Sequence, residues 1–244
     1  MELRVLSLYP EQMNIYADRG NILFLQRRCE WRGIGFEWDG AGPGASIDPA
    51  AHDLFYIGGG QDRDQRVVAA DLVETKRAAL AEAVDDGAAL LAVCGGYQLL
   101  GESYQLGPET LPGLALADLR TVREEGSRLI GNVAIETELG GEKRLLAGFE
   151  NHGGRTSLGA GARPLGRVVK GHGNNGSDGL EGVWRDNMVG TYLHGPLLPK
   201  NAWLADHLIE LALERRYGKR PQLDPLPDTL ERAAHASARA AAGA

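Results

Sequence analysis

The stretch Ala88–Gly101, AALLAVCGGYQLLG, constrains the fold of this 244-residue chain more than any other segment. A short run of apolar, β-prone residues ends at Cys94, two glycines follow at once, and the next residues suit a helix. This order predicts a nucleophile elbow, a sharp strand-to-helix turn that presents a reactive side chain. The glycines permit the strained turn, and a helix N-terminus behind the cysteine favours a thiolate. The alternative is an inert core cysteine, which is what we expect for Cys29.

Strand and helix signals alternate through the first half of the chain. Alternation over this length predicts an α/β fold, a mostly parallel twisted sheet with helices on both faces. The expected strands cover Leu3–Leu8, Ile34–Trp38, Asp53–Ile57 and Ala88–Val93, and the expected helices cover Gly20–Trp31 and Arg66–Val84.

The second half of the chain predicts a more antiparallel edge, because short strand-like runs are separated by Gly, Asn and Asp turns. These runs are Leu129–Glu136, Arg167–Val169, Leu180–Trp184 and Met188–Leu193. A closing helix is expected over Asn201–Tyr217, with Asn201 as its cap. We therefore expect one domain over residues 1–220. Residues 221–244, rich in Pro and then in Ala and Arg, predict an extended arm with a short terminal helix, mobile unless a partner holds it.

Composition excludes several classes of function. A net charge of −7 with no basic stripe argues against a nucleic-acid-binding surface. No run approaches the roughly 18 apolar residues of a membrane span, and the N-terminus lacks the pattern of a secretory signal. With only two cysteines, a disulfide framework is not expected, so we expect a cytoplasmic protein. No cluster of His, Cys, Asp or Glu has ligand spacing, so no metal is expected.

A reactive cysteine needs a base, and His194 in MVGTYLHGPLL is the best candidate among the six histidines. It stands at the end of a strand-like run, where a histidine satisfied at a sheet edge is the alternative. His152 lies in the glycine-rich segment NHGGRT, which either lines a site or forms a hydrogen-bonded loop. Cys94 and His194 together predict thiol chemistry on an acyl group.

Three glycines, Gly58–Gly60, follow the expected strand that ends at Ile57. Their spacing matches neither a P-loop nor a dinucleotide fingerprint. Backbone N–H groups beside an elbow can stabilise an oxyanion, so Gly59, Gly60 and Gly95 are the expected donors. A plain tight turn is the alternative.

Several motifs occur in an order that resembles a known family. VCGGYQLLG, the GGG turn and GTYLHGPLL resemble class I glutamine amidotransferases, which have a flavodoxin-like fold, in the branch of the cobyric acid synthase glutaminase domains. LYPEQMNIYADRGN, GGGQDRDQ, SRLIGN, ENHGGRT and GTYLHGPLLPKN, between about residues 6 and 206, resemble more closely the glutaminase subunits of lipid II isoglutaminyl synthases.

This resemblance implies a heterodimer in which one subunit hydrolyses L-glutamine and passes ammonia to a Mur-ligase-like partner subunit. The partner would use ATP and Mg²⁺ to activate the α-carboxyl of D-glutamate in the lipid II stem peptide, with no cofactor in the glutaminase subunit. This would be a step of peptidoglycan biosynthesis. One alternative is a glutaminase serving a corrinoid synthetase. Another is a non-catalytic binding module that kept the fold.

The resemblance also implies residue roles. Cys94 corresponds to the nucleophile, His194 to the base, and Arg128 to the residue that holds glutamine, a role that suits a guanidinium facing an α-carboxylate. Further expected substrate-binding residues are Gln98, Asn151 and His152. Many class I relatives have a glutamate two residues after the histidine, where this chain has Pro196, so a Cys–His dyad is expected. The segment Asp18-Arg19-Gly20 is expected near the site or the partner.

Overall fold

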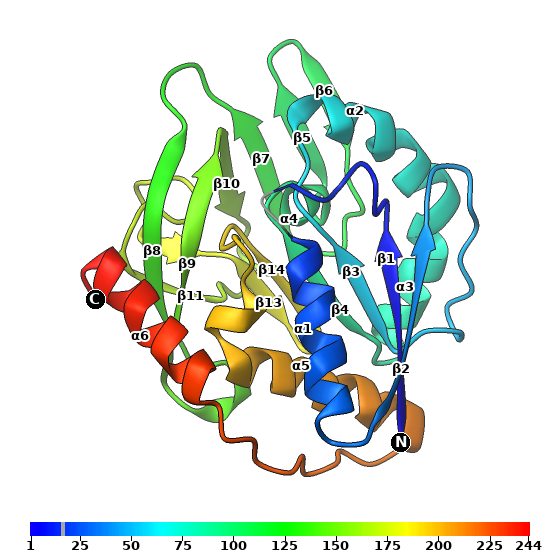
Figure 1. The fold of residues 1–244 in the computed structure, drawn as a ribbon. Helices are drawn as coiled ribbons and strands as arrows, with labels where there is room; N and C mark the ends of the chain where they lie inside the picture. The colour runs from blue at the N-terminus through cyan, green and yellow to red at the C-terminus, as the bar shows by residue number, and fades with distance from the viewer. Residues whose placement is uncertain (16–17) are drawn as a thin grey trace.

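A six-stranded sheet forms the centre of the computed structural model, which describes residues 1–15 and 18–244 (Figure 1). Five neighbouring strands are parallel and only the edge strand β13 runs antiparallel, which confirms the expected α/β class. In spatial order the strands are β13 (Val183–Arg185), β14 (Met188–Thr191), β4 (Ala89–Val93), β3 (Leu54–Ile57), β1 (Glu2–Leu8) and β2 (Gly35–Ala41).

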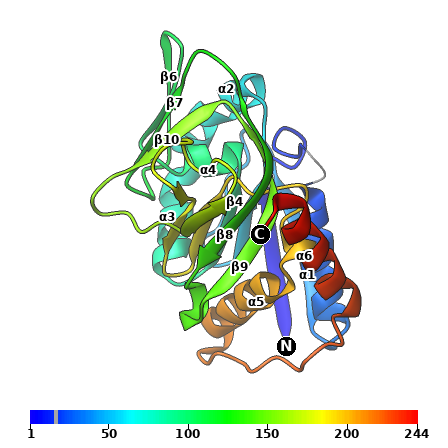
Figure 2. The same cartoon turned by 90° about the vertical axis from the view of Figure 1, so that its left-hand side faces the viewer.

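Helices cover both faces of this sheet, as a buried parallel sheet requires. Figure 2 shows α1 (Arg19–Glu30) and α5 (Ala202–Tyr217) on one face. The other face carries α2 (Asp62–Asp71), α3 (Arg77–Asp85) and the short α4 (Gly95–Leu99). The central strands β3 and β4 are buried at every residue, so the core lies on both sides of them.

Two four-stranded sheets complete the fold and provide the antiparallel part expected in the second half. One contains β10 (Gly154–Leu158), β7 (Leu119–Arg123), β5 (Ser103–Leu106) and β6 (Glu109–Pro112). The other contains β12 (Leu180–Glu181), β11 (Gly166–Lys170), β8 (Leu129–Thr137) and β9 (Arg144–His152). Strands β5, β6, β7, β9 and β10 were not expected from the sequence.

The prediction of a single helix over Arg66–Val84 is wrong in two respects. The helical region starts earlier, at Asp62, and a π-helical turn over Leu72–Lys76 separates α2 from α3. The extra residue in that turn brings Lys76 inward, where its Nζ lies 2.5 Å from Asp71 Oδ2 and 4.8 Å from the centroid of the Tyr9 ring. The π-helical turn thus places a charge pair within a helical region whose apolar periodicity looks continuous.

Two further expectations need correction. The strand expected over Leu180–Trp184 is divided by Gly182, whose φ of +65° breaks the extended backbone between β12 and β13. Asn201 precedes α5 but makes no side-chain cap. Its Oδ1 instead accepts the Ala147 N–H at 3.0 Å and its Nδ2 donates to the Ala147 carbonyl at 2.9 Å, which ties α5 to β9.

The C-terminal residues lie against the rest of the chain. The segment after α5 runs extended and leads into α6 (Thr229–Ala242), which lies along β8 and β9 (Figure 1). The fully buried Arg28 of α1 donates to Asp228 at 2.7 Å and to Asp206 of α5, which fastens the start of α6. Asn132 donates to the Ala241 carbonyl at 3.1 Å near the other end. The predicted boundary at residue 220, between the domain and the C-terminal arm, stays a prediction.

Parallel strands place their carboxyl ends at one edge of a sheet. At this edge β3 leads into Gly58–Gly60, β4 leads into Cys94, and β14 leads toward His194. The expected site residues therefore gather at the edge where α/β proteins bind ligands. Among the described residues, no helix has the length and apolar character needed to cross a bilayer.

Candidate active site

Cys94 sits at the strained turn between β4 and α4, as the elbow prediction requires. Its backbone has φ +52° and ψ −106°, a conformation that a non-glycine residue rarely adopts. The Cys94 N–H donates to the Thr191 carbonyl of β14 at 2.8 Å. The turn therefore fixes the sulfur beside the carboxyl end of β14.

The two glycines after Cys94 are required by close backbone packing. A Cβ at Gly95 would lie 2.8 Å from the Gly60 nitrogen, and one at Gly96 would lie 2.6 Å from the Ile57 carbonyl oxygen. The Gly96 N–H also donates to the Gly58 carbonyl at 3.1 Å. The glycine loop after β3 and the elbow after β4 thus pack directly on each other.

The three glycines differ in what their backbones can offer a substrate. Gly60 lines the cavity at Cys94. The Gly59 N–H instead donates to Asp18 Oδ2 at 2.7 Å, so in this conformation Gly59 is not a free oxyanion donor. Gly60 and Gly95 remain the predicted donors. The segment Asp18-Arg19-Gly20 was expected near the site or the partner. Its Asp18 holds the glycine loop in place through this hydrogen bond.

His194 lies three residues beyond the end of β14 and is fully buried. Its backbone pairs with Phe149 of β9 through two hydrogen bonds of 2.9 and 3.2 Å, and its ring stands edge-on to the Phe149 ring. Because Thr191 aligns with Val93 in the parallel pair β14–β4, Cys94 and His194 leave adjacent strand ends. The two residues therefore lie at neighbouring strand ends. Cys94 lines the cavity described below, whereas His194 is not among the described residues that line it.

Burial determines the charge of both groups. Burial, with a further contribution from the Asp18 carboxyl, raises the pKa of Cys94 to about 12. Burial, with a smaller effect of the neighbouring His152, lowers the pKa of His194 to about 4. Both groups are therefore neutral near pH 7. Burial of the sulfur therefore disfavours the expected thiolate in this structure.

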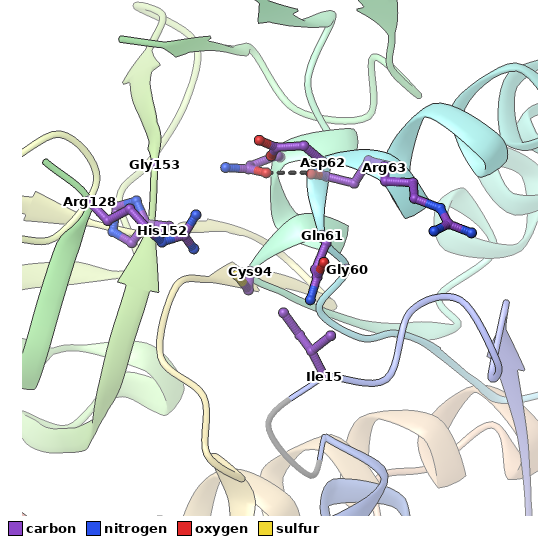
Figure 3. A pocket seen from close by; sticks show the side chains of 11 residues that line it. Ile15, Gly60, Gln61, Asp62, Arg63, Cys94, Arg128, His152 and Gly153 are labelled. Carbon is purple, nitrogen blue, oxygen red and sulfur yellow. Dashed lines mark hydrogen bonds between the residues drawn. The ribbon is translucent and has the colours of Figure 1, made fainter. Parts of the chain in front are cut away.

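A cavity of about 270 Å³ opens at Cys94 and has the size of a small ligand (Figure 3). Five residues predicted from the sequence line it, namely Gly60, Cys94, Gln98, Arg128 and His152. Asp62 and Gln65 of α2 line it as well and were not predicted, although both lie in the GGGQDRDQ motif. Of the LYPEQMNIYADRGN motif, Ile15 lines the cavity, and residues 16–17 lie outside the described residues.

Arg128 is held at the cavity by Asn151. Its Nε donates to Asn151 Oδ1 at 2.7 Å and its Nη2 donates to the Asn151 carbonyl at 2.6 Å. Asn151 thus holds the Arg128 side chain, and it is not among the described residues that line the cavity, so its predicted contact with the substrate stays a prediction. The segment Asn151–Gly154 is also not a loop, since Asn151 and His152 end β9 and Gly154 begins β10.

Gln98 and His152 belong to a buried polar network around Tyr192. Gln98 Oε1 accepts from Gln65 Nε2 at 2.8 Å, and Gln98 Nε2 donates to the Tyr192 hydroxyl at 3.1 Å. The His152 ring stacks on the Tyr192 ring with centroids 3.5 Å apart, and His152 Nδ1 donates to the Gly154 carbonyl at 2.9 Å. These contacts fix the shape of the cavity wall.

In the part of the chain that the structure describes, no group of three or more His, Cys, Asp or Glu side chains is arranged to hold a metal ion. What the fold and the site define is an α/β protein with a cysteine on a nucleophile elbow, a buried histidine at the neighbouring strand end and an arginine over the cavity. This combination is that of a cysteine-dependent glutamine amidotransferase.

Comparison with known proteins gives the family. A model of the CobB/CobQ-like glutamine amidotransferase domain matches residues 4–202, and the chain belongs to this family. It is 41% identical over 216 residues to the lipid II isoglutaminyl synthase (glutamine-hydrolyzing) subunit GatD of Staphylococcus aureus, covering 88% of this chain and 86% of that protein. The subunit of the same name from Streptococcus pneumoniae is 38% identical over 230 residues, covering 94% and 87%.

More distant proteins support the branch and the fold. Cobyric acid synthase of Pelotomaculum thermopropionicum is 36% identical over 157 residues, which cover 57% of this chain and 28% of that protein. Among solved structures, a chain of PurLQS from Thermotoga maritima shares the fold with a TM-score of 0.58 at 20% identity, over 90% of this chain and 100% of that one. The Trypanosoma brucei CTPS glutaminase domain shares it with a TM-score of 0.51 at 11% identity, over 91% and 98%.

Proposed function

We propose that this chain hydrolyses L-glutamine and delivers the ammonia to a Mur-ligase-like partner subunit that amidates the α-carboxyl of D-glutamate in the lipid II stem peptide. The observation that carries the proposal is that Cys94 and Arg128 line one cavity at the edge of the sheet where β14, the strand that leads to His194, also ends. The two relatives named as GatD subunits match this chain over most of its length, which favours this destination for the ammonia.

The reaction begins from a neutral thiol and a neutral imidazole. Cys94 Sγ attacks the side-chain carbonyl carbon of glutamine while its proton passes to His194, which avoids a resting thiolate in a buried site. The developing oxyanion faces the N–H groups of Gly60 and Gly95. His194 then gives the proton to the leaving nitrogen, so the C–N bond breaks, ammonia departs and a glutamyl thioester remains on Cys94.

Water completes the turnover. His194 takes a proton from the attacking water, the carbon–sulfur bond breaks, and the proton returns to Sγ as glutamate forms. Arg128 holds the α-carboxylate of the substrate through both chemical steps, in the orientation set by Asn151. Gln98 and His152 form the wall against which the side chain of the substrate lies. No cofactor is required for these steps.

The partner subunit is proposed to carry the ATP and Mg²⁺ chemistry that activates the carboxylate. A heterodimer in the cytoplasm fits this division of labour, because the ATP and the stem peptide are handled by the partner. A corrinoid synthetase is the second candidate recipient. It is supported by the cobyric acid synthase matches, but these cover much less of the chain.

Two measurements test this proposal. Ammonia release from glutamine is measured for the wild type and for Cys94→Ala and His194→Ala, with the co-purifying partner present. Both variants are expected to lose turnover, whereas Cys29→Ala, at the other buried cysteine, is expected to keep it. Mass spectrometry of the co-purified proteins is expected to identify a Mur-ligase-like subunit. Full turnover in Cys94→Ala, or a corrinoid synthetase as the partner, would contradict the proposal.

A further inference from the structure

Free glutamine carries two opposite charges at its α-carbon, a carboxylate and an ammonium. The proposed function, on which this inference rests, assigns Arg128 to the carboxylate and leaves the ammonium without an acceptor. A site that selects the free amino acid needs such an acceptor, because an ammonium left unpaired inside a partly buried cavity costs binding free energy.

Asp62 is placed to fill this role. It is the first residue of α2 and stands two positions after Gly60, the last residue of the glycine loop. Figure 3 shows Arg128 and Asp62 reaching the cavity from opposite sides, with Cys94 between them and Arg63 pointing away. The Asp62 carboxylate and the Arg128 guanidinium thus face the same small space with opposite charges.

The Asp62 carboxylate also retains bonding capacity. Its Oδ1 accepts the Tyr104 hydroxyl at 3.0 Å, which holds the side chain in place. Its Oδ2 forms a long ion pair with Arg123, whose Nε lies 4.0 Å away, beyond the distance of a hydrogen bond. The Asp62 side chain is 37% exposed, so a ligand can reach it. One oxygen therefore remains available to an ammonium donor.

Other acidic groups near the cavity are committed to the protein. Asp64 forms the capping box of α2 with Gln61. Asp18 is fully buried and accepts the Gly59 N–H. Glu150 is fully buried and accepts the N–H groups of His172 and Gly173 at 2.6 and 2.9 Å. Asp62 is distinguished from these three by its combination of exposure, firm placement and an available oxygen.

We propose that Asp62 accepts the α-ammonium of glutamine opposite Arg128, and that this pair of charges restricts the site to the free amino acid. Glutamine inside a peptide or with an acylated α-nitrogen lacks the cationic group, so the site discriminates against it. Asp62 is thus a specificity-determining residue for the amino acid, distinct from the groups that act on the amide.

The test compares two substrates that differ only in the ammonium group. Hydrolysis of L-glutamine and of glutaramate, which has the same carbon chain and no α-amino group, is measured for the wild type and Asp62→Asn with the partner present. The asparagine keeps an acceptor for Tyr104 and removes the charge. We expect Asp62→Asn to lower kcat/KM for glutamine about 10- to 100-fold, mainly by raising KM. The kcat/KM for glutaramate is expected to change little.

Asp64→Asn is the matched control, because it removes a negative charge from the same turn of α2 while keeping a cap acceptor. It is expected to leave the preference for glutamine over glutaramate unchanged. If Asp62→Asn keeps the full wild-type preference while glutamine is still hydrolysed, the assignment of Asp62 is overturned and the proposed function stands. If the wild-type complex releases no ammonia from glutamine, both are overturned.

Discussion

The backbone N–H of Cys94 donates a 2.8 Å hydrogen bond to the carbonyl oxygen of Thr191, which joins the carboxyl ends of β4 and β14. This bond sets the strained turn at Cys94 beside the strand that leads to His194. Two residues separated by about a hundred positions in the sequence thereby share one edge of the sheet. The chemistry of the site depends on this junction and on the glycines that let neighbouring loops approach it.

Gly96→Ala is expected to destabilise the fold around the elbow. The new Cβ would lie 2.6 Å from the Ile57 carbonyl oxygen and 2.9 Å from that of Gly58, and both are backbone atoms that cannot rotate away. Overpacking of this kind costs about 1–3 kcal/mol in the free energy of unfolding. Urea unfolding of Gly96→Ala and of Gly42→Ala, where a Cβ meets nothing within 4 Å, checks this. Equal stability of the two variants would contradict the packing described here.

Alkylation of Cys94 by iodoacetamide in the free protein is expected to rise steadily with pH. Burial raises the pKa of Cys94 to about 12, so the thiolate fraction grows about tenfold per pH unit through the neutral range. His194→Asn is expected to alter this rate little, since burial lowers the pKa of His194 to about 4 and the neutral ring does not stabilise a thiolate. A plateau of the rate near pH 7 would show a preformed ion pair instead.

Asn151→Ala is expected to raise KM for glutamine with little change in kcat, because Asn151 orients Arg128 without contacting the reacting amide. Arg128→Ala is expected to raise KM more, by about 10- to 100-fold. In the double variant the effect of Asn151→Ala should nearly vanish, since it acts through Arg128. Additive effects of the two substitutions in steady-state kinetics would refute the positioning role of Asn151.

Asp18→Asn is expected to change the pH dependence of stability. Burial raises the pKa of Asp18 to about 7 from a model-peptide value of 3.8, so the folded state binds more protons than the unfolded state between these values. The wild type therefore loses stability as pH rises from about 4 to about 7, by up to about 1.4 kcal/mol per pH unit.

Asparagine at position 18 keeps an acceptor for the Gly59 N–H and does not titrate, so the variant should lose less stability over this range. Urea unfolding at about pH 5 and about pH 7.5 compares the two proteins. Parallel losses in the wild type and the variant would show that Asp18 does not carry the raised pKa.

The elbow and the parallel sheet were predictable because their signals are local. A buried-strand pattern, Cys94 and two glycines lie within a few positions, and each of the first four strands carries its own apolar run. The family resemblance rested on the same local motifs, and the comparisons confirm it.

Features set by distant contacts were not predictable. The commitment of Gly59 to Asp18, the tie between Asn201 and Ala147, and the π-helical turn at Lys76 each depend on partners remote in sequence or on burial of a charge. Asp62 was missed because its motif was assigned to the glycines that precede it. The end of β9 was missed because the glycines of NHGGRT suggested a loop, whereas pairing with β8 holds Asn151 and His152 in a strand.

Peptide mass spectrometry of the chain quenched during turnover tests the covalent role of Cys94 most directly. The complex is mixed with L-glutamine, quenched in acid and digested, and the peptide containing Cys94 is examined. The wild type is expected to carry one glutamyl group on Cys94, and Cys94→Ala is expected to carry none and to release no ammonia. Continued conversion of glutamine to glutamate and ammonia by Cys94→Ala would contradict the account.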